Sequence, residues 1–166
     1  MNVIFDRVFS MPNKNTFEMK PARDFIFDYL GHPGQSNRTY DPFCGISKIA
    51  MFKNDLAQTG IDSTDWLRSL EDGCAELVLF DPPYSPRQLK ECYNSIGQSL
   101  HDTKSSVWKI WKDEIARITQ HGGWVLSFGN NSMGIGKGNG FEIERIRLIP
   151  HGGNHYDTIC VAERKL

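Results

Sequence analysis

The sequence lacks any apolar run approaching the ~18 residues of a membrane-spanning helix. Its first eight residues contain an acid and lack the basic start of a signal peptide. From these two absences we expect a cytoplasmic protein with no membrane association. No internal repeat, low-complexity tail or linker divides the 166 residues, so we expect a single domain, 1–166.

Closely spaced cysteines and an excess of basic charge are also missing. The four cysteines, Cys44, Cys74, Cys92 and Cys160, form no Cys-x-x-Cys pair, which indicates free thiols rather than a disulfide framework or a zinc site. The chain has 19 basic and 20 acidic residues and a net charge of −1. A nucleic-acid partner would therefore have to be held by a local basic surface.

What the sequence does contain is a short apolar strand that ends in an unusual polar turn. Residues 77–80 read Leu-Val-Leu-Phe, which suits a strand buried on both faces. Asp81 follows, then Pro82 and Pro83, which have no backbone N–H for ladder pairing, and then Tyr84. A carboxylate, a stiff carbonyl-bearing turn and an aromatic ring are thus expected where open α/β sheets bind ligands.

These groups suit a planar amine such as the amino group of adenine. Asp81 and the main-chain carbonyl of Pro82 could each accept one N–H, which turns the nitrogen lone pair toward an electrophile. Tyr84 could stack on the ring, as aromatic residues do with an extruded base. The alternative is a structural turn with Asp81 as a helix cap. The complete Asp-Pro-Pro-Tyr after an apolar strand favours the amine site.

The rest of the chain predicts a mixed α/β domain. Helices are expected over 22–30, from 63 to about 72, and over 107–119, where apolar residues recur at helical spacing. Residues 1–15 contain no predicted strand, and 132–140 is a glycine-rich loop. Strands are expected at 38–41, 49–55, 61–62, 77–80, 124–128, 141–149 and 156–163. The last two would form an antiparallel pair beside a parallel sheet.

Three stretches together carry a family resemblance: Asp41-Pro42-Phe43-Cys44-Gly45, the strand-ending acid Asp55, and Asp81-Pro82-Pro83-Tyr84. They resemble the amino-group methyltransferases of DNA, above all the adenine-specific branch. Residues 17–21 resemble the element before the first motif, and 124–130 and 141–163 resemble the last three strands. The resemblance implies a Rossmann-like methyltransferase fold: a mostly parallel seven-stranded sheet, a C-terminal antiparallel hairpin, and helices on both faces.

The resemblance also implies S-adenosylmethionine as the cofactor, and no metal. The implied cofactor-binding residues are Phe17, Lys20, Asp41, Phe43, Gly45, Asp55, Asp62 and Ser63. Asp55 would bind the ribose hydroxyls, and Asp62 would lie near the adenine amino group of the cofactor. The implied catalytic residues are Asp81, Pro82, Pro83 and Tyr84. They would hold the target base in line with the sulfonium methyl, and no general base is required.

The sequence departs from the family in two places. Only ten positions separate Gly45 from Asp55, too few for a strand–helix–strand crossover. Either a loop replaces the helix, or Asp55 is not the ribose acid. The second departure is that no segment is long enough for a target-recognition domain. The substrate contacts expected instead are Arg87, Lys90 and Lys104 in 87–104, together with Asn130 and Lys137. Specificity would be slight, or supplied by a second copy of the chain or a partner.

The sequence thus predicts an enzyme, an adenine-specific DNA methyltransferase. Cytosine amino-group transfer and RNA adenine methylation are alternatives within the same chemistry. Asp81 favours adenine over cytosine, because the cytosine enzymes more often have Ser before Pro-Pro-Tyr, whereas DNA and RNA are not distinguished. A different class is a non-catalytic nucleic-acid or partner-binding module that retains the fold, which the abbreviated first motif favours.

A metal-dependent hydrolase is the last alternative, suggested by His151 and His155 with Asp157 nearby. A His-x-x-x-His pair binds zinc well on a helix, but Gly152 and Gly153 make a helix improbable at this point. These histidines are therefore expected in a hairpin turn.

Overall fold

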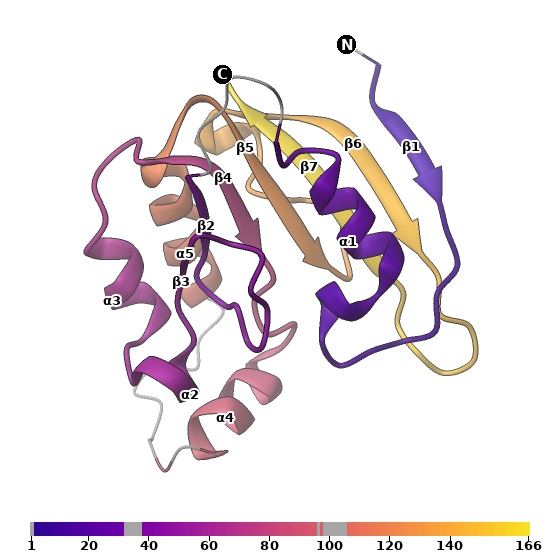
Figure 1. The fold of residues 1–166 in the computed structure, drawn as a ribbon, viewed down its shortest axis with the longest axis horizontal. Coiled ribbons are helices and arrows are strands. Elements are labelled where there is room, and N and C mark those ends of the chain that lie inside the picture. Colours follow the sequence, from indigo (N-terminus) through magenta and orange to yellow (C-terminus); the bar gives the residue numbers. More distant parts are fainter. Residues whose placement is uncertain (1, 32–37, 96, 98–105) are drawn as a thin grey trace.

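The computed structural model describes residues 2–31, 38–95, 97 and 106–166. Within them a seven-stranded sheet has the order β1-β6-β7-β5-β4-β2-β3 (Figure 1). Its strands are β1 Ile4–Arg7, β2 Thr39–Asp41, β3 Phe52–Lys53, β4 Ala75–Phe80, β5 Thr119–Gly129, β6 Phe141–Ile149 and β7 Thr158–Lys165. Only β7 runs antiparallel to its neighbours, β5 and β6. The expectation of a mostly parallel α/β sheet with a C-terminal antiparallel pair is confirmed.

The helices pack around this sheet. They are α1 Lys20–Phe27, α2 Leu56–Thr59, α3 Ser63–Arg68, α4 Pro86–Ser95 and α5 Ser106–Ile118, with short 3₁₀ turns η1 Thr16–Glu18 and η2 Lys137–Asn139. None of the helices in the described part of the chain is long and apolar enough to cross a membrane.

Strand β4 is buried along nearly its whole length, as the apolar run at 77–80 predicted. Leu77 and Leu79 belong to one hydrophobic cluster, together with Phe25 of α1 and Phe128 of β5. Their neighbours Val78 and Phe80 belong to a second cluster, with Leu67 of α3 and Trp111 of α5. Successive strand residues point to opposite faces, so β4 contributes to two separate cores.

The seven strands are not the seven that the sequence predicted. Residues 61–62 form no strand; Asp62 instead caps α3, and its Oδ1 accepts a hydrogen bond from the Thr64 N–H at 2.7 Å. The seventh strand is β1, which lies at the sheet edge and is mostly exposed. It pairs with β6, but the sequence of β1 has no apolar pattern from which a buried strand could be predicted.

The boundaries of other elements also differ from the prediction. Strand β3 has only two residues of the expected 49–55, because most of that segment is a connecting loop. Strand β5 begins at Thr119 rather than at the expected residue 124, so Gly122 and Gly123 lie inside it. Helix α1 ends at Phe27, although Tyr29 and Leu30 still pack against its cluster.

A carboxylate on β1 fixes this edge strand to the sheet. Asp6 accepts hydrogen bonds from Arg145 at 2.6 Å and from Arg147 at 2.5 Å, and both guanidinium groups lie over the ring of Phe25. Burial opposes ionisation, but the hydrogen bonds from Arg147 and Arg145 outweigh it and lower the pKa of Asp6 below its ordinary value.

The chain then continues beside the end of β6 as an N-terminal arm, residues 8–16. The Val8 N–H donates to the Leu148 carbonyl at 3.0 Å, and the Ser10 N–H donates to the Pro150 carbonyl at 3.3 Å. Nδ1 of the His151 ring lies within hydrogen-bond distance of the Ser10 carbonyl oxygen, at 2.9 Å. These contacts hold the arm across the edge of the sheet where the parallel strands end.

We expect Asp6→Asn to lower the free energy of unfolding at pH 7 by about 1–3 kcal/mol, because two largely buried guanidinium groups would lose their charged acceptor. The folded pKa lies below the unfolded one. The contribution is therefore present above about pH 4 and is lost as the pH falls through the folded value. Urea unfolding at pH 7 and at about pH 3 measures both effects.

The matched control is Asp113→Asn, which removes an exposed i,i+4 pair with Lys109. It should change stability by no more than about 0.5 kcal/mol. Equal losses in the two variants would contradict the anchoring role of Asp6.

Candidate active site

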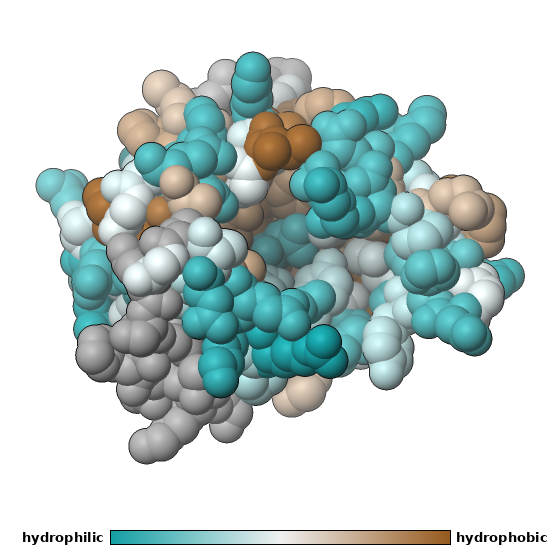
Figure 2. All heavy atoms as spheres, turned by 90° about the horizontal axis from the view of Figure 1, so that it is seen from below, coloured by the Kyte–Doolittle hydropathy of each residue, from teal (hydrophilic) through white to brown (hydrophobic). Residues whose placement is uncertain are grey.

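The carboxyl ends of the parallel strands open into one large cavity. Strands β2 and β4 pair in parallel, with Tyr40 opposite Val78, so the chain leaves both strands at the same edge. The cavity there has a volume of about 1170 Å³. Figure 2, seen from below the view of Figure 1, shows the molecule hollowed on this side, with mostly hydrophilic residues around the hollow. Typical small-molecule sites measure roughly 300–1,000 Å³, so this cavity has room for more than one ligand.

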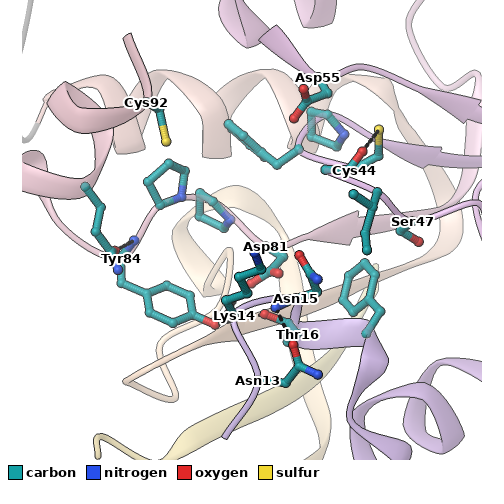
Figure 3. A pocket seen from close by; sticks show the side chains of 18 of the residues that line it. Asn13, Lys14, Asn15, Thr16, Cys44, Ser47, Asp55, Asp81, Tyr84 and Cys92 are labelled. Atoms are coloured by element: carbon teal, nitrogen blue, oxygen red, sulfur yellow. Dashed lines mark hydrogen bonds between the residues drawn. The ribbon is translucent and has the colours of Figure 1, made fainter. Parts of the chain in front are cut away.

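Asp81, Pro82, Pro83 and Tyr84 all line the cavity. The Tyr84 hydroxyl donates to Asp81 Oδ1 at 3.2 Å and lies 3.3 Å from the Thr16 hydroxyl (Figure 3). The Tyr84 N–H donates to Gln88 Oε1 at 2.7 Å, which fixes the turn to the first turn of α4.

Asp81 is not a helix cap. At the start of α4 the Ser85 hydroxyl accepts from the Gln88 N–H at 3.2 Å, as a capping side chain does. The structural alternative for Asp81 is therefore wrong, and its carboxylate is left facing the cavity.

The surroundings of this carboxylate change its protonation. Burial raises the pKa of Asp81 to about 6, although hydrogen bonds from the Thr16 and Tyr84 hydroxyls partly offset the rise. Burial and the Asp81 charge raise the pKa of Tyr84 above its ordinary value, so the phenol stays a hydrogen-bond donor. At neutral pH Asp81 is mostly ionised, but at a cost in free energy.

Six of the eight residues expected at the cofactor line the same cavity: Phe17, Phe43, Gly45, Asp55, Asp62 and Ser63. Asp55 caps α2 by accepting from the Ala57 N–H at 3.1 Å. Asp62 caps α3 with one oxygen, and its other oxygen accepts a hydrogen bond from the Tyr93 hydroxyl. The Ser63 hydroxyl is buried and donates to the Pro42 carbonyl at 2.9 Å.

The connection between β2 and β3 is a loop, residues 42–51, and not a helix. The two strands are nevertheless parallel, with Tyr40 opposite Phe52. The Asn54 N–H donates to the Asp41 carbonyl, and the Asn54 side chain donates to the Ile61 carbonyl. Of the two alternatives drawn from the sequence, the first is therefore correct: a loop replaces the helix. Asp55 still lines the cavity.

Asp41 lies behind the cavity wall and is fully buried. Its Oδ1 accepts from the Phe43 N–H at 3.0 Å, whereas Oδ2 has no hydrogen-bond partner among the described residues. Burial, with the nearby charges of Asp81 and Asp55, raises the pKa of Asp41 to about 8. An unpartnered buried oxygen is costly, so this position calls for a hydrogen-bonding partner.

Several predicted residues are not brought to the cavity. Lys20 is exposed and pairs with Asp24 on α1. Arg87 pairs with Glu91, and the predicted substrate residues Arg87, Lys90, Asn130 and Lys137 are exposed without lining the cavity. Lys104 lies outside the described residues. The predicted substrate surface on α4 therefore does not face the site.

Sequence reasoning missed the wall formed by the N-terminal arm and the β6–β7 loop. Its cavity-lining residues are Asn13, Lys14, Asn15, Thr16, His151, His155, Tyr156 and Thr158. No local pattern marks these residues, because their place depends on the pairing of β1 with β6.

His151 and His155 do lie in the β6–β7 connection, as expected. The two ring nitrogens of His151 contact the Ser10 carbonyl and the Thr158 hydroxyl, each at 2.9 Å, which leaves neither open to a metal. In the described ranges, no group of three or more His, Cys, Asp or Glu side chains is placed to hold a metal ion.

Comparison of the chain with protein-family models and with curated proteins finds no match. The function must therefore be argued from the residues and their arrangement.

We expect Asp81→Asn to raise the stability of the protein at pH 8 by about 1–2 kcal/mol, because it removes a charge from a desolvated site. The folded pKa is raised, so the favourable contribution of wild-type Asp81 exists below about pH 4 and is lost as the pH rises through about 6. The gain of the variant should therefore shrink toward pH 4. Urea unfolding across this range, with the exposed Asp113→Asn as control, tests it; a gain independent of pH would contradict the assignment.

Proposed function

We propose that the protein is an enzyme that transfers a methyl group from S-adenosylmethionine to the exocyclic amino group of adenine in DNA. The observation that carries the proposal is that two motifs far apart in the sequence line one cavity: Phe43 to Gly45 with Asp55, and Asp81 to Tyr84. Both resemble motifs of the adenine-specific amino-group methyltransferases.

The architecture supports a Rossmann-like methyltransferase fold. The sheet is mostly parallel and ends in the antiparallel strand β7. The two hydrophobic clusters, one with α1 and one with α3 and α5, support the expectation of helices on both faces. The site also lies beyond the carboxyl ends of the strands, as ligand sites of open α/β sheets do.

The residues of the cavity fit the cofactor. Asp55 and Asp62 present carboxylate oxygens, which suit hydroxyl and amino donors. The unpartnered Oδ2 of buried Asp41 calls for a hydrogen-bonding partner behind the same wall. Gly45 has a φ of 51° and open space on its Cβ side, so the backbone can be approached closely. When bound, S-adenosylmethionine would supply an electrophilic methyl group to this cavity.

The roles of the chain's own residues follow from their contacts. An incoming amine would displace the Tyr84 hydroxyl from Asp81 Oδ1 and donate its two N–H groups to Asp81 and to the Pro82 carbonyl. The ring of Tyr84, which is 38% exposed, would then stack on the base. These residues orient the nitrogen lone pair and exclude water, and Asp81 can take the proton that the nitrogen loses after transfer.

A non-catalytic nucleic-acid-binding module is the second candidate. It is favoured by the loop that replaces the helix after β2, and by the Tyr93 hydroxyl that already occupies one oxygen of Asp62. Calorimetry with S-adenosylmethionine separates the two candidates. Heat of binding supports the enzyme, and its absence with and without DNA supports the module.

We expect Asp81→Ala to reduce methyl transfer by at least about a hundredfold while cofactor binding persists, because the amine would lose its charged acceptor. Incubation with labelled S-adenosylmethionine and DNA or RNA, followed by nucleoside analysis, measures the transfer and identifies the base. Tyr84→Phe is the matched control: it keeps the stacking ring and should retain activity within about tenfold, whereas Tyr84→Ala should not. Full activity in Asp81→Ala would refute the proposal.

The rate of transfer should depend on pH through Asp81. The ionised carboxylate is the better acceptor, and its pKa is raised to about 6, so the rate should fall roughly tenfold per unit below that pH and level off above it. Residual activity in Asp81→Asn should lack this dependence. An unchanged profile in that variant would assign the titration to another group.

A further inference from the structure

Three basic side chains line the cavity from three different segments. Lys14 comes from the N-terminal arm, Arg23 from α1, and Lys48 from the loop between β2 and β3. Lys14 and Lys48 are exposed and Arg23 is half-buried. Figure 3 shows the side chain of Lys14 among those that line the cavity. None of the three was expected at the site from the sequence.

These three cations make no ion pair with any residue that the structure describes. Many other basic residues of the molecule are paired: Lys20 with Asp24, Arg87 with Glu91, Lys109 with Asp113, Arg117 with Asp72, and Arg145 and Arg147 with Asp6. In a chain with slightly more acids than bases, unpaired cations around one cavity are an anion-binding arrangement.

Acids also line the cavity, so its charge is mixed, but they lie at other places than the three cations. Asp55 and Asp62 are bound to helix N-termini, and Asp81 lies within the turn after β4. Glu91 is paired with Arg87. Glu18 is the lining acid closest in sequence to Lys14 and Arg23, and it too is exposed. The acids at strand and helix ends suit donors, and the three cations suit phosphate oxygens.

An exposed aromatic residue lines the same cavity. Tyr156, in the β6–β7 loop, lines the cavity and is 88% exposed. The loop is held to the N-terminal arm by His151 and by the Ser10–Pro150 hydrogen bond, so Tyr156 and Lys14 lie on one connected wall. An exposed ring beside unpaired cations is the combination by which proteins bind nucleic-acid strands, through stacked bases and neutralised phosphates.

We propose that the surface formed by Lys14, Arg23, Lys48 and Tyr156 binds the sugar–phosphate backbone and a neighbouring base of a nucleic-acid strand. The three cations contact phosphates on either side of the nucleotide held at Asp81, and Tyr156 stacks on an adjacent base. This surface replaces the one predicted on α4, where Arg87 and Lys90 do not line the cavity. The identity of the ligand as a nucleic acid rests on the proposed function. Binding at this surface does not require that methyl transfer occurs.

The experiment compares two triple variants of equal charge change. Lys14→Gln/Arg23→Gln/Lys48→Gln neutralises the proposed surface, and Arg87→Gln/Lys90→Gln/Lys109→Gln neutralises exposed cations of α4 and α5. Binding of fluorescently labelled oligonucleotides is measured by anisotropy without cofactor at several salt concentrations. The first variant should bind at least about tenfold more weakly at low salt and should lose about one unit of salt slope per removed contact. The second should match the wild type.

Separate arms identify the strand and the type of contact. Single-stranded DNA, duplex DNA and RNA of one sequence are compared, with heparin as a polyanion without bases. Tyr156→Ala should weaken binding of nucleic acid roughly tenfold, with an unchanged salt slope and unchanged heparin binding, because stacking is not ionic. Tyr156→Phe should restore it. Loss of heparin binding as well would show that Tyr156 acts only through the fold.

Each result either supports or overturns the proposed binding surface. Equal losses in the two triple variants, a loss only in the α4 and α5 variant, or no binding by the wild type would overturn the inference. If Arg23→Gln unfolds α1, the double variant Lys14→Gln/Lys48→Gln carries the test, because both lysines are exposed. Surface-dependent binding without methyl transfer would refute the proposed activity and leave the binding surface standing.

Discussion

The parallel pairing of β2 with β4 is the interaction on which the site depends. It places the chain after Asp41 and the chain after Phe80 at the same edge of the sheet, although nearly forty residues separate them. The same pairing brings Asp41 and Asp81 into a desolvated region where each carboxylate is hard to ionise. Burial at this edge is the main cause of the raised pKa of both groups, and the charges of Asp81 and Asp55 add to it at Asp41.

The sequence was sufficient to predict the parts of the fold that rest on local patterns. Strand β4 contains an uninterrupted apolar run, and helix α5 has apolar residues at helical spacing. The turn from Asp81 to Tyr84 follows from its two prolines. The short connection between β2 and β3 could be counted directly. What could not be predicted was β1, whose side chains are mostly exposed and whose place is set by Asp6 contacting two arginines more than a hundred residues away.

The predicted substrate residues Arg87 and Lys90 do not line the cavity, for a different reason. Counting basic residues in 87–104 ignored the helical period of α4. Leu89 is buried and Tyr93 is half-buried, so that side of the helix faces the cavity while Arg87 and Lys90 face solvent. That signal was present in the sequence. The role of Lys14 was not, because nothing local reveals that an irregular arm crosses the ends of the strands.

The carboxylates of Asp55 and Asp62 have a property that their burial alone does not convey. Asp55 and Asp62 each give one oxygen to the N-terminus of a helix, so each side chain is locked into one rotamer before any ligand arrives. Immobilising a side chain on binding usually costs about 0.5–1.5 kcal/mol. For Asp55 and Asp62 this conformational entropy is already lost when the protein folds, and not when a ligand binds. A ligand that reaches Asp55 therefore meets a preorganised acceptor, and at Asp62 it meets one whose second oxygen already accepts from the Tyr93 hydroxyl.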